Sequence, residues 1–234
     1  MSATKLVQRW MMPRLAKQVR AAKLTYLANE RFLSLAREIK RIKRDNVPGD
    51  FYELGIALGG SAIFIAGQLD GARKFKGFDV FGMIPPPTER DGEDTHVRYE
   101  TIAQGKSVGI GGDEYYGYVD NLYEKVLRSF SEFKIPVDGD RVSLHKGLFE
   151  NTLKIGAGDH ISLAHIDCDW FDPVYHCLSA ISPVLSPGGV IVVDDYNDFG
   201  GCRKAVDLYL EEDKSLSMKK SHPHAILVKT YAAS

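Results

Sequence analysis

Four aspartates follow two short apolar runs of the sequence, and their positions suggest metal chemistry. Asp167 and Asp169 come directly after one run, and Asp194 and Asp195 come directly after another. If the two runs are neighbouring strands of a parallel sheet, their carboxyl ends meet at one edge and crowd the four carboxylates together. Like charges that close repel unless a cation lies among them or a proton is shared. Because hard divalent cations prefer carboxylate oxygen, we expect a divalent metal site at this edge.

The four aspartates can divide the chemistry between them. Asp167, Asp194 and Asp195 can offer metal ligands from adjacent strand ends. Asp169 lies further along its loop and can take a proton as a general base. A purely structural alternative is helix capping, for which Asp172 is the best candidate because it precedes a proline.

The D-x-D spacing of Asp167 and Asp169 has other interpretations. It occurs in metal-dependent glycosyltransferases and in phosphatases with an aspartyl nucleophile. The phosphatase motif belongs after the first core strand, whereas this one follows the fourth expected strand. The glycosyltransferase interpretation stays open, although it gives no role to Asp194 and Asp195. A third hypothesis is a binding subunit without catalysis.

A glycine-rich turn follows the first expected strand, in the stretch E-L-G-I-A-L-G-G that runs from Glu53 to Gly60. It departs from G-x-G-x-x-G, since Ala57 takes the place of the middle glycine and its methyl group would intrude on a pyrophosphate. The turn therefore suits a ligand without phosphate, such as S-adenosylmethionine, and equally fits an ordinary strand–helix turn. Glu53 could bind a cationic amino group. Asp79, at the end of the second expected strand, stands where an acidic residue binds ribose hydroxyls.

The elements that position these residues alternate between strands and helices, as in an α/β fold. Residues 82–117 interrupt the alternation with prolines, glycines and charges but little periodicity, which is typical of a functional lid or a disordered insertion. The last strand is expected to be antiparallel at or near an edge. Strands are predicted at 51–55, 75–79, 142–145, 161–166, 190–193 and 225–230, and helices at 61–69, 119–133, 149–153, 173–184 and 202–209.

The N-terminal residues 5–46 are predicted to be helical, with Pro13 separating an outer helix from an inner one. Basic residues gather here. A membrane surface or a nucleic acid could attract them, but they are scattered around the helix without interleaved aromatics. We therefore expect a solvated face on a helix that packs against the core or joins two subunits into a homo-oligomer. The expected division is a helical extension at 1–46 and a catalytic domain at 47–234.

Composition narrows the class of protein. The 234 residues carry a formal net charge of −1, which gives no overall attraction to nucleic acid or membrane. Three cysteines without C-x-x-C spacing argue against a zinc site and a disulfide framework, and predict the cytoplasm. No apolar stretch approaches a membrane span, and charges occupy the N-terminus where a signal peptide needs an apolar core.

Several motifs, in this order, resemble the macrocin O-methyltransferase family over about residues 24–229. The family shows L-D-x-D-x-Y, L-x-P-G-G, D-D-Y and G-x-x-x-A-V-D. This sequence has H-I-D-C-D-W-F-D, L-S-P-G-G-V-I-V-V-D-D-Y and G-C-R-K-A-V-D, preceded by P-G-D-F-Y-E-L-G-I-A-L-G-G-S and F-D-V-F-G-M-I-P-P-P. Phe171 replaces the tyrosine of the first motif. The resemblance implies an α/β, Rossmann-like class I methyltransferase fold, with a doubly wound, mostly parallel sheet, an antiparallel edge strand and N-terminal helices.

The resemblance also implies an activity and a set of site residues. Members transfer a methyl group from S-adenosylmethionine to a sugar hydroxyl with the help of magnesium, so the acceptor would be a sugar-containing small molecule or a glycan with vicinal hydroxyls. Pro85 onward would form the mobile lid. Asp79 would hold the ribose and Asp169 would be the base. The methionine part would meet Glu53, Gly55, Gly60 and Ser61, the adenine Gly147, Leu148 and Phe149, and the magnesium Asp167, Asp194 and Asp195.

Overall fold

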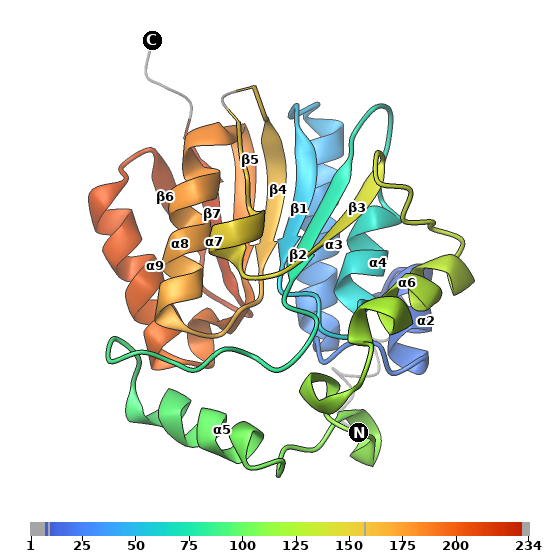
Figure 1. The fold of residues 1–234 in the computed structure, drawn as a ribbon. Coiled ribbons are helices and arrows are strands. Elements are labelled where there is room, and N and C mark those ends of the chain that lie inside the picture. The colour runs from blue at the N-terminus through green and yellow to red at the C-terminus, as the bar shows by residue number, and fades with distance from the viewer. Residues whose placement is uncertain (1–7, 9, 157, 231–234) are drawn as a thin grey trace.

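The computed structural model describes residues 8, 10–156 and 158–230. At its centre is a seven-stranded sheet with the order β3-β2-β1-β4-β5-β7-β6 (Figure 1). Strands β1 to β5 pair in parallel, β7 is antiparallel to β5, and β6 is antiparallel to β7. The predicted doubly wound, mostly parallel sheet is confirmed. The strands are β1 (Asp50–Leu54), β2 (Phe75–Asp79), β3 (Val142–Lys146), β4 (Ile161–Ile166), β5 (Leu185–Val193), β6 (Leu216–Lys220) and β7 (Ala225–Lys229).

Helices cover both faces of the sheet, as the apolar character of the central strands requires. Every residue of β4 is buried. Helices α3, α4 and α6 share one hydrophobic cluster with one face, and α8 and α9 share a second cluster with the other. The helices are α2 (Arg14–Ala21), α3 (Asn29–Arg44), α4 (Gly60–Ala66), α5 (Glu93–Ala103), α6 (Leu122–Glu132), α7 (Phe149–Thr152), α8 (Phe171–Ile181) and α9 (Gly200–Glu212).

The N-terminal region differs from the prediction. Residues 22–28 leave the helical path, so the inner helix predicted up to residue 46 is in fact the two helices α2 and α3. Helix α3 buries Phe32, Leu35 and Ile39 in the same cluster as β4 and β5. Lys5 and Arg9, counted in the basic segment, lie outside the described residues.

The lid segment 82–117 is more regular than the sequence predicted. It contains α5, which runs below the sheet on the side where the parallel strands end (Figure 1). Only Thr95 and Ile102 of this helix are buried, so it has almost no apolar stripe from which it could be predicted. The edge strand β6 was also missed. No helix in the described residues is long and apolar enough to cross a membrane.

Candidate active site

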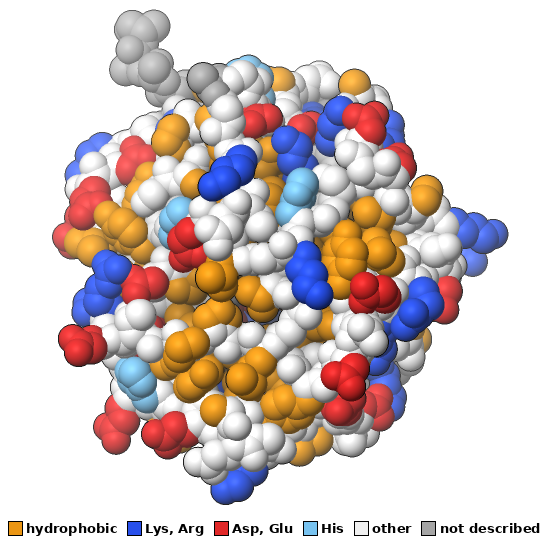
Figure 2. Space-filling view, viewed as in Figure 1, with side chains coloured by type: hydrophobic (Ala, Val, Ile, Leu, Met, Phe, Trp, Pro, Cys, Tyr) orange, Lys and Arg blue, Asp and Glu red, His pale blue; other side chains and the backbone are white. Residues whose placement is uncertain are grey.

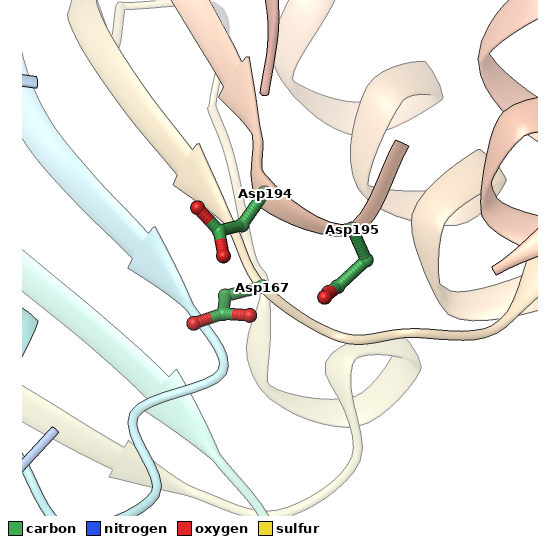
Figure 3. Close-up of side chains that lie close together, drawn as sticks. All are labelled: Asp167, Asp194 and Asp195. Atoms are coloured by element: carbon green, nitrogen blue, oxygen red, sulfur yellow. The ribbon is translucent and has the colours of Figure 1, made fainter. Parts of the chain in front are cut away.

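The acidic cluster lies at the ends of β4 and β5, where the sequence placed it. Each of Asp167, Asp194 and Asp195 offers a carboxylate oxygen, and these atoms all lie within 4.8 Å of one another. Figure 3 shows the three side chains converging in front of the two strand ends. Asp167 continues the β4 backbone, and its amide donates to the Leu54 carbonyl of β1. Asp194 and Asp195 begin the short 3-10 turn Asp194–Asn197.

Asp194 is surrounded by positive and proton-donating groups. The Arg31 guanidinium lies 2.5 Å from Asp194 Oδ2, and His224 Nδ1 donates to Asp194 Oδ1 at 3.1 Å. The Nε2 atom of His224 accepts from the Ser34 hydroxyl at 3.0 Å, which fixes the ring. Burial alone would raise the pKa of Asp194, but His165 and His224 outweigh it and hold that pKa below its usual value. Asp194 is therefore a carboxylate with its charge compensated.

Asp167 and Asp195 are in the opposite situation. Neither pairs with a lysine, arginine or histidine in the part of the chain that the structure describes. Desolvation raises the pKa of both carboxyls well above the usual range; the charge of Asp194 adds to the effect at Asp167, and that of Asp169 adds to it at Asp195. An all-oxygen donor set with uncompensated negative charge fits a hard divalent cation.

Asp169 is held beside this cluster in an unusual conformation. Its backbone has φ = 59°, in the left-handed region, and its amide donates to Asp195 Oδ2 at 3.3 Å. Burial raises its pKa to about 6. A carboxyl with such a pKa can accept a proton near neutral pH.

The capping role suggested for Asp172 is wrong. Helix α8 begins at Phe171, one residue earlier than Asp172, with Trp170 as its N-cap and no capping hydrogen bond from that side chain. The Phe171 amide instead donates to Asp91 of the lid at 2.8 Å. Asp172 lies within the first turn and forms an ion pair with Arg90.

The glycine-rich turn after β1 contacts the acidic cluster through its backbone. Gly55 has φ = 94°, and a Cβ there would lie 1.8 Å from the Asp167 carbonyl oxygen. Ala57 is also left-handed, with φ = 47°. Asp79 holds the turn, because its Oδ2 accepts the amides of Ile56 at 2.6 Å and Ala57 at 3.0 Å.

Three residues predicted to contact the methionine part lie behind the turn. Glu53 is fully buried, and its Oε1 accepts from His165 Nδ1 at 2.8 Å, while Oε2 has no hydrogen-bond partner among the described residues. The Gly60 amide donates to the Leu24 carbonyl at 2.8 Å, and Ser61 is buried within α4. None of these three lines a pocket. His165 is a core residue, as predicted, but only its Nδ1 atom is satisfied, because Nε2 has no hydrogen-bond partner among the described residues.

A large pocket of about 820 Å³ opens beside the turn. Gly55 and Asp79 line one end, and Leu148 and Phe149 line another, together with the lid from Gly82 onward. In Figure 2, hydrophobic side chains gather around the hollow in the middle of this face. Gly147, predicted to lie near the adenine, is absent from the lining and donates its amide to the Asp79 carbonyl.

A second pocket of about 330 Å³ lies over the acidic cluster. It shares Gly55, Asp79, Tyr116, Asp167, Asp169 and Trp170 with the large pocket, so the two spaces adjoin. Its remaining walls are rich in aromatic and charged side chains, namely Tyr26, Arg31, Arg98, Tyr115, Asp194, Asp195, Asp198 and Phe199. Two adjoining pockets, with Asp169 on the border, allow transfer of a group between two bound molecules.

Comparison with known proteins identifies the family. The profile of the Macrocin-O-methyltransferase (TylF) family matches residues 13–219. The chain belongs to this family. It is an S-adenosylmethionine-dependent O-methyltransferase, and the match decides against the glycosyltransferase interpretation of Asp167 and Asp169.

Curated relatives are similar across most of the methyltransferase. An enzyme of Streptomyces olivaceus named 8-demethyl-8-(2,3-dimethoxy-alpha-L-rhamnosyl)-tetracenomycin-C 4'-O-methyltransferase is 29% identical, over 79% of this chain and 67% of its own length. Mycinamicin III 3''-O-methyltransferase of Micromonospora griseorubida is 27% identical, over 79% and 69%.

Solved structures show the same fold. The O-methyltransferase NovP has a TM-score of 0.72 and 23% identity, covering 88% of this chain and 82% of NovP. The calicheamicin methyltransferase CalS11 has a TM-score of 0.56 and 19% identity, covering 98% and 93%. The predicted class I methyltransferase fold is confirmed.

Sequence reasoning missed several residues of the methyltransferase site. Arg31, His224 and Ser34 surround Asp194, yet Arg31 and Ser34 come from α3, far away in the sequence. Arg98 lies over the Tyr115 ring, 5.6 Å from its centroid, on a helix that was not predicted. No local motif marks these positions, and only the pairing of α3 and the lid with the sheet edge brings them to the site.

Proposed function

We propose that this methyltransferase moves the methyl group of S-adenosylmethionine to a sugar hydroxyl in a reaction that needs magnesium. The observation that carries the proposal is the acidic cluster in the floor of the small pocket, directly beside the large one. The curated relatives support the sugar acceptor, since one is named for a rhamnosyl group. The acceptor is a small molecule or glycan with vicinal hydroxyls.

The large pocket is the proposed cofactor site. Asp79 faces it at the end of β2, where a carboxylate can accept from ribose hydroxyls. Leu148 and Phe149 offer an apolar wall to the adenine. The methionine part would extend past Gly55, which lines both pockets, toward the small pocket. Glu53 lines neither pocket and would act from behind the turn, where its Oε2 atom has no hydrogen-bond partner among the described residues.

The small pocket is the proposed acceptor and metal site. Asp167, Asp194 and Asp195 would hold Mg²⁺, which when bound lowers the pKa of an acceptor hydroxyl. Asp169 takes the proton of that hydroxyl. The oxygen forms a bond to the methyl carbon as the sulfur–methyl bond breaks, leaving S-adenosylhomocysteine. Holding both molecules in adjoining pockets supplies much of the acceleration.

Aromatic side chains give the small pocket a suitable surface for a sugar. Tyr26, Tyr115 and Tyr116 line one side, and Trp170 and Phe199 line another. Aromatic faces pack against apolar sugar C–H groups, and tyrosine hydroxyls can bond to the sugar oxygens. Association through the N-terminal helices and location in the cytoplasm stay predictions.

The proposal is tested with S-adenosylmethionine and a panel of glycosides that carry deoxysugars with neighbouring hydroxyls. Mass spectrometry should detect one added methyl group on the glycoside. A chelator should abolish this methylation, and added Mg²⁺ should restore it. Asp169→Asn should lower turnover by about 10²- to 10⁴-fold, the usual contribution of a general base, while S-adenosylhomocysteine binding is kept. Asp207→Asn, which makes the same change at an exposed partner of the Tyr196 hydroxyl, serves as control.

Three results would contradict parts of this proposal. Full turnover in chelator-treated protein removes the metal from the mechanism. Unchanged turnover in Asp169→Asn removes the base. Methylation of non-sugar hydroxyls alone, across the whole panel, removes the sugar acceptor.

A further inference from the structure

The first part of the lid, residues 85–94, bonds to the starts of both helices that follow the acidic turns. The Trp170 indole Nε1 donates to the Pro85 carbonyl at 2.9 Å. The Phe171 amide donates to Asp91 Oδ1 at 2.8 Å, and the Gly200 amide donates to Asp94 Oδ2 at 3.2 Å. We call residues 85–94 the latch.

The latch supplies hydrogen-bond acceptors to the first amides of α8 and α9. Helix α8 begins just after the turn with Asp167 and Asp169, and α9 begins just after the turn with Asp194 and Asp195. Neither helix has a capping hydrogen bond from its own N-cap side chain. The first amides of a helix need acceptors, and a carboxylate there is also favoured by the helix dipole. The lid provides one carboxylate to each helix.

The fit between the latch and α9 is close. A Cβ on Gly201 would lie 2.0 Å from Asp91 Oδ1, so only glycine lets the lid carboxylate settle between the two helix starts. Asp91 Oδ2 also accepts the Thr88 amide at 3.0 Å, which fixes the carboxylate within the lid. Trp170 and Phe199, the residues before α8 and α9, pack edge to face at 5.2 Å between ring centroids.

The same latch is a wall of the cofactor pocket. Pro85, Pro86, Thr88 and Arg90 all line the large pocket. One segment therefore covers the pocket on one side and holds the two acidic turns on the other. If this segment moves away, it opens the pocket and uncaps both helices in the same step.

The backbone conformation of Asp169 depends on support from neighbouring contacts. Its left-handed backbone is disfavoured for a residue with a side chain, and such conformations persist where neighbouring contacts over-determine them. The two residues that follow Asp169 both bond directly to the latch.

We propose that Asp91 and Asp94 are positioning residues for the methyl transfer. By capping α8 and α9 when the lid closes, they order the acidic turns and set Asp169 in its working conformation. The role of Asp169 as base rests on the proposed function, but the capping role does not. The acidic site is then assembled only while the cofactor pocket is covered.

Trp170 reports on the latch directly. The chain has two tryptophans, and Trp10 is exposed while Trp170 is buried against the lid. In a Trp10→Phe background, Trp170 is the sole tryptophan. We measure acrylamide quenching of its emission in protein saturated with S-adenosylhomocysteine. Asp91→Ala should raise the quenching constant roughly threefold, since the latch opens more often without its cap.

Two matched variants separate a specific cap from general damage. Asp91→Asn keeps an acceptor oxygen for the Phe171 amide, so its Trp170 quenching constant should equal that of the Trp10→Phe parent. Glu93→Ala removes a carboxylate from the same lid. The Glu93 side chain has no hydrogen bond or ion pair with any described residue, so the Trp170 quenching constant of this variant should also equal that of the parent. The proposal is overturned if Asp91→Ala quenches like Glu93→Ala, or if Asp91→Asn is as strongly quenched as Asp91→Ala.

Hydrogen exchange tests the effect on the acidic turns without any acceptor or turnover. Peptides over 167–173 and 194–201 should exchange about tenfold faster in Asp91→Ala and Asp94→Ala, respectively, since losing a helix cap changes an opening equilibrium by about that factor. Unchanged exchange there would overturn the positioning role even if Asp169 proves to be the base. Faster exchange combined with unimpaired turnover of Asp169→Asn would instead uphold the capping and refute the base.

Discussion

The glycine-rich turn after β1 and the acidic turns after β4 and β5 lie at the same edge of the sheet, yet their polar groups are satisfied differently. Behind the first turn, Glu53 bonds to His165, and Asp79 accepts backbone amides. In the acidic turns, Asp167 and Asp195 line the small pocket, and neither forms an ion pair with a basic residue in the described part of the chain. The first region thus finds most of its partners within the fold, whereas the second leaves two carboxyls without a cationic partner among the residues that the structure describes.

The two regions nevertheless touch. Gly55 of the first turn packs directly against the carbonyl of Asp167, and the Asp167 amide bonds to Leu54. The glycine-rich turn therefore supports the backbone of the acidic turn that contains Asp167. Substitutions can test both the difference between the two regions and the contact between Gly55 and Asp167.

The largest effect is expected from Asp195→Ala. Losing a metal ligand should reduce turnover by roughly a thousandfold, because a bound cation contributes several kcal/mol to such reactions. The melting temperature of the metal-free variant should equal or exceed that of the metal-free parent, since a buried carboxylate without a cationic partner is removed. Steady-state kinetics and calorimetry without metal would show both. A lower metal-free melting temperature would mean that Asp195 is a structural residue.

Glu53→Ala, unlike Asp195→Ala, should destabilise the fold. It leaves His165 buried without its carboxylate, and breaking a buried pair in this way costs about 3–5 kcal/mol. Glu53→Gln keeps an oxygen for the His165 ring and should lose less than half of that. Urea unfolding gives the values. If both variants lose the same small amount, the pair contributes little to folding.

Gly55→Ala tests the contact between the regions. A methyl group at 1.8 Å from the Asp167 carbonyl forces the backbone apart, which should cost roughly 2–3 kcal/mol of stability. Gly71→Ala is a matched control, because Gly71 also has positive φ but a Cβ added there would meet no atom within 4 Å. Its cost should be only about 1–2 kcal/mol, that of the left-handed backbone. Equal losses would show that the approach of the two turns is loose.

Ala57→Gly should have the smallest effect and is expected to be favourable. Glycine accepts the left-handed backbone of residue 57 without steric cost, but it adds freedom to the unfolded chain. The balance should raise stability by roughly 0.5 kcal/mol, measured by urea unfolding. A clear loss would show that the Ala57 methyl group packs productively in the small pocket.

The sequence predicted much of this framework for identifiable reasons. Strand β4 has the predicted bounds because a short, mostly apolar run that ends at polar residues marks a buried parallel strand. Strand β2 also has the predicted bounds. The clustering of the three aspartates was predictable because they directly follow adjacent parallel strands. The Asp172 cap was wrong, since local sequence cannot show that a lid carboxylate from Asp91 already bonds to the helix start.

Other parts of the site depend on contacts that no sequence window contains. Arg31 reaches Asp194 across 163 positions of the chain. Glu53 looked like a ligand-binding residue by position, and only the fold shows that His165 occupies its Oε1 atom. Helix α5 escaped prediction because its apolar residues are few, and its place is set by its contacts with the turns.

We propose that Asp167, Asp194 and Asp195 together hold a divalent cation beside the cofactor. The most direct measurement is calorimetric titration of Mg²⁺ into protein saturated with S-adenosylhomocysteine, compared with Asp167→Ala treated in the same way. We expect one ion bound per chain in the parent protein and none in the variant. No binding in the parent, or equal binding in both proteins, would contradict it.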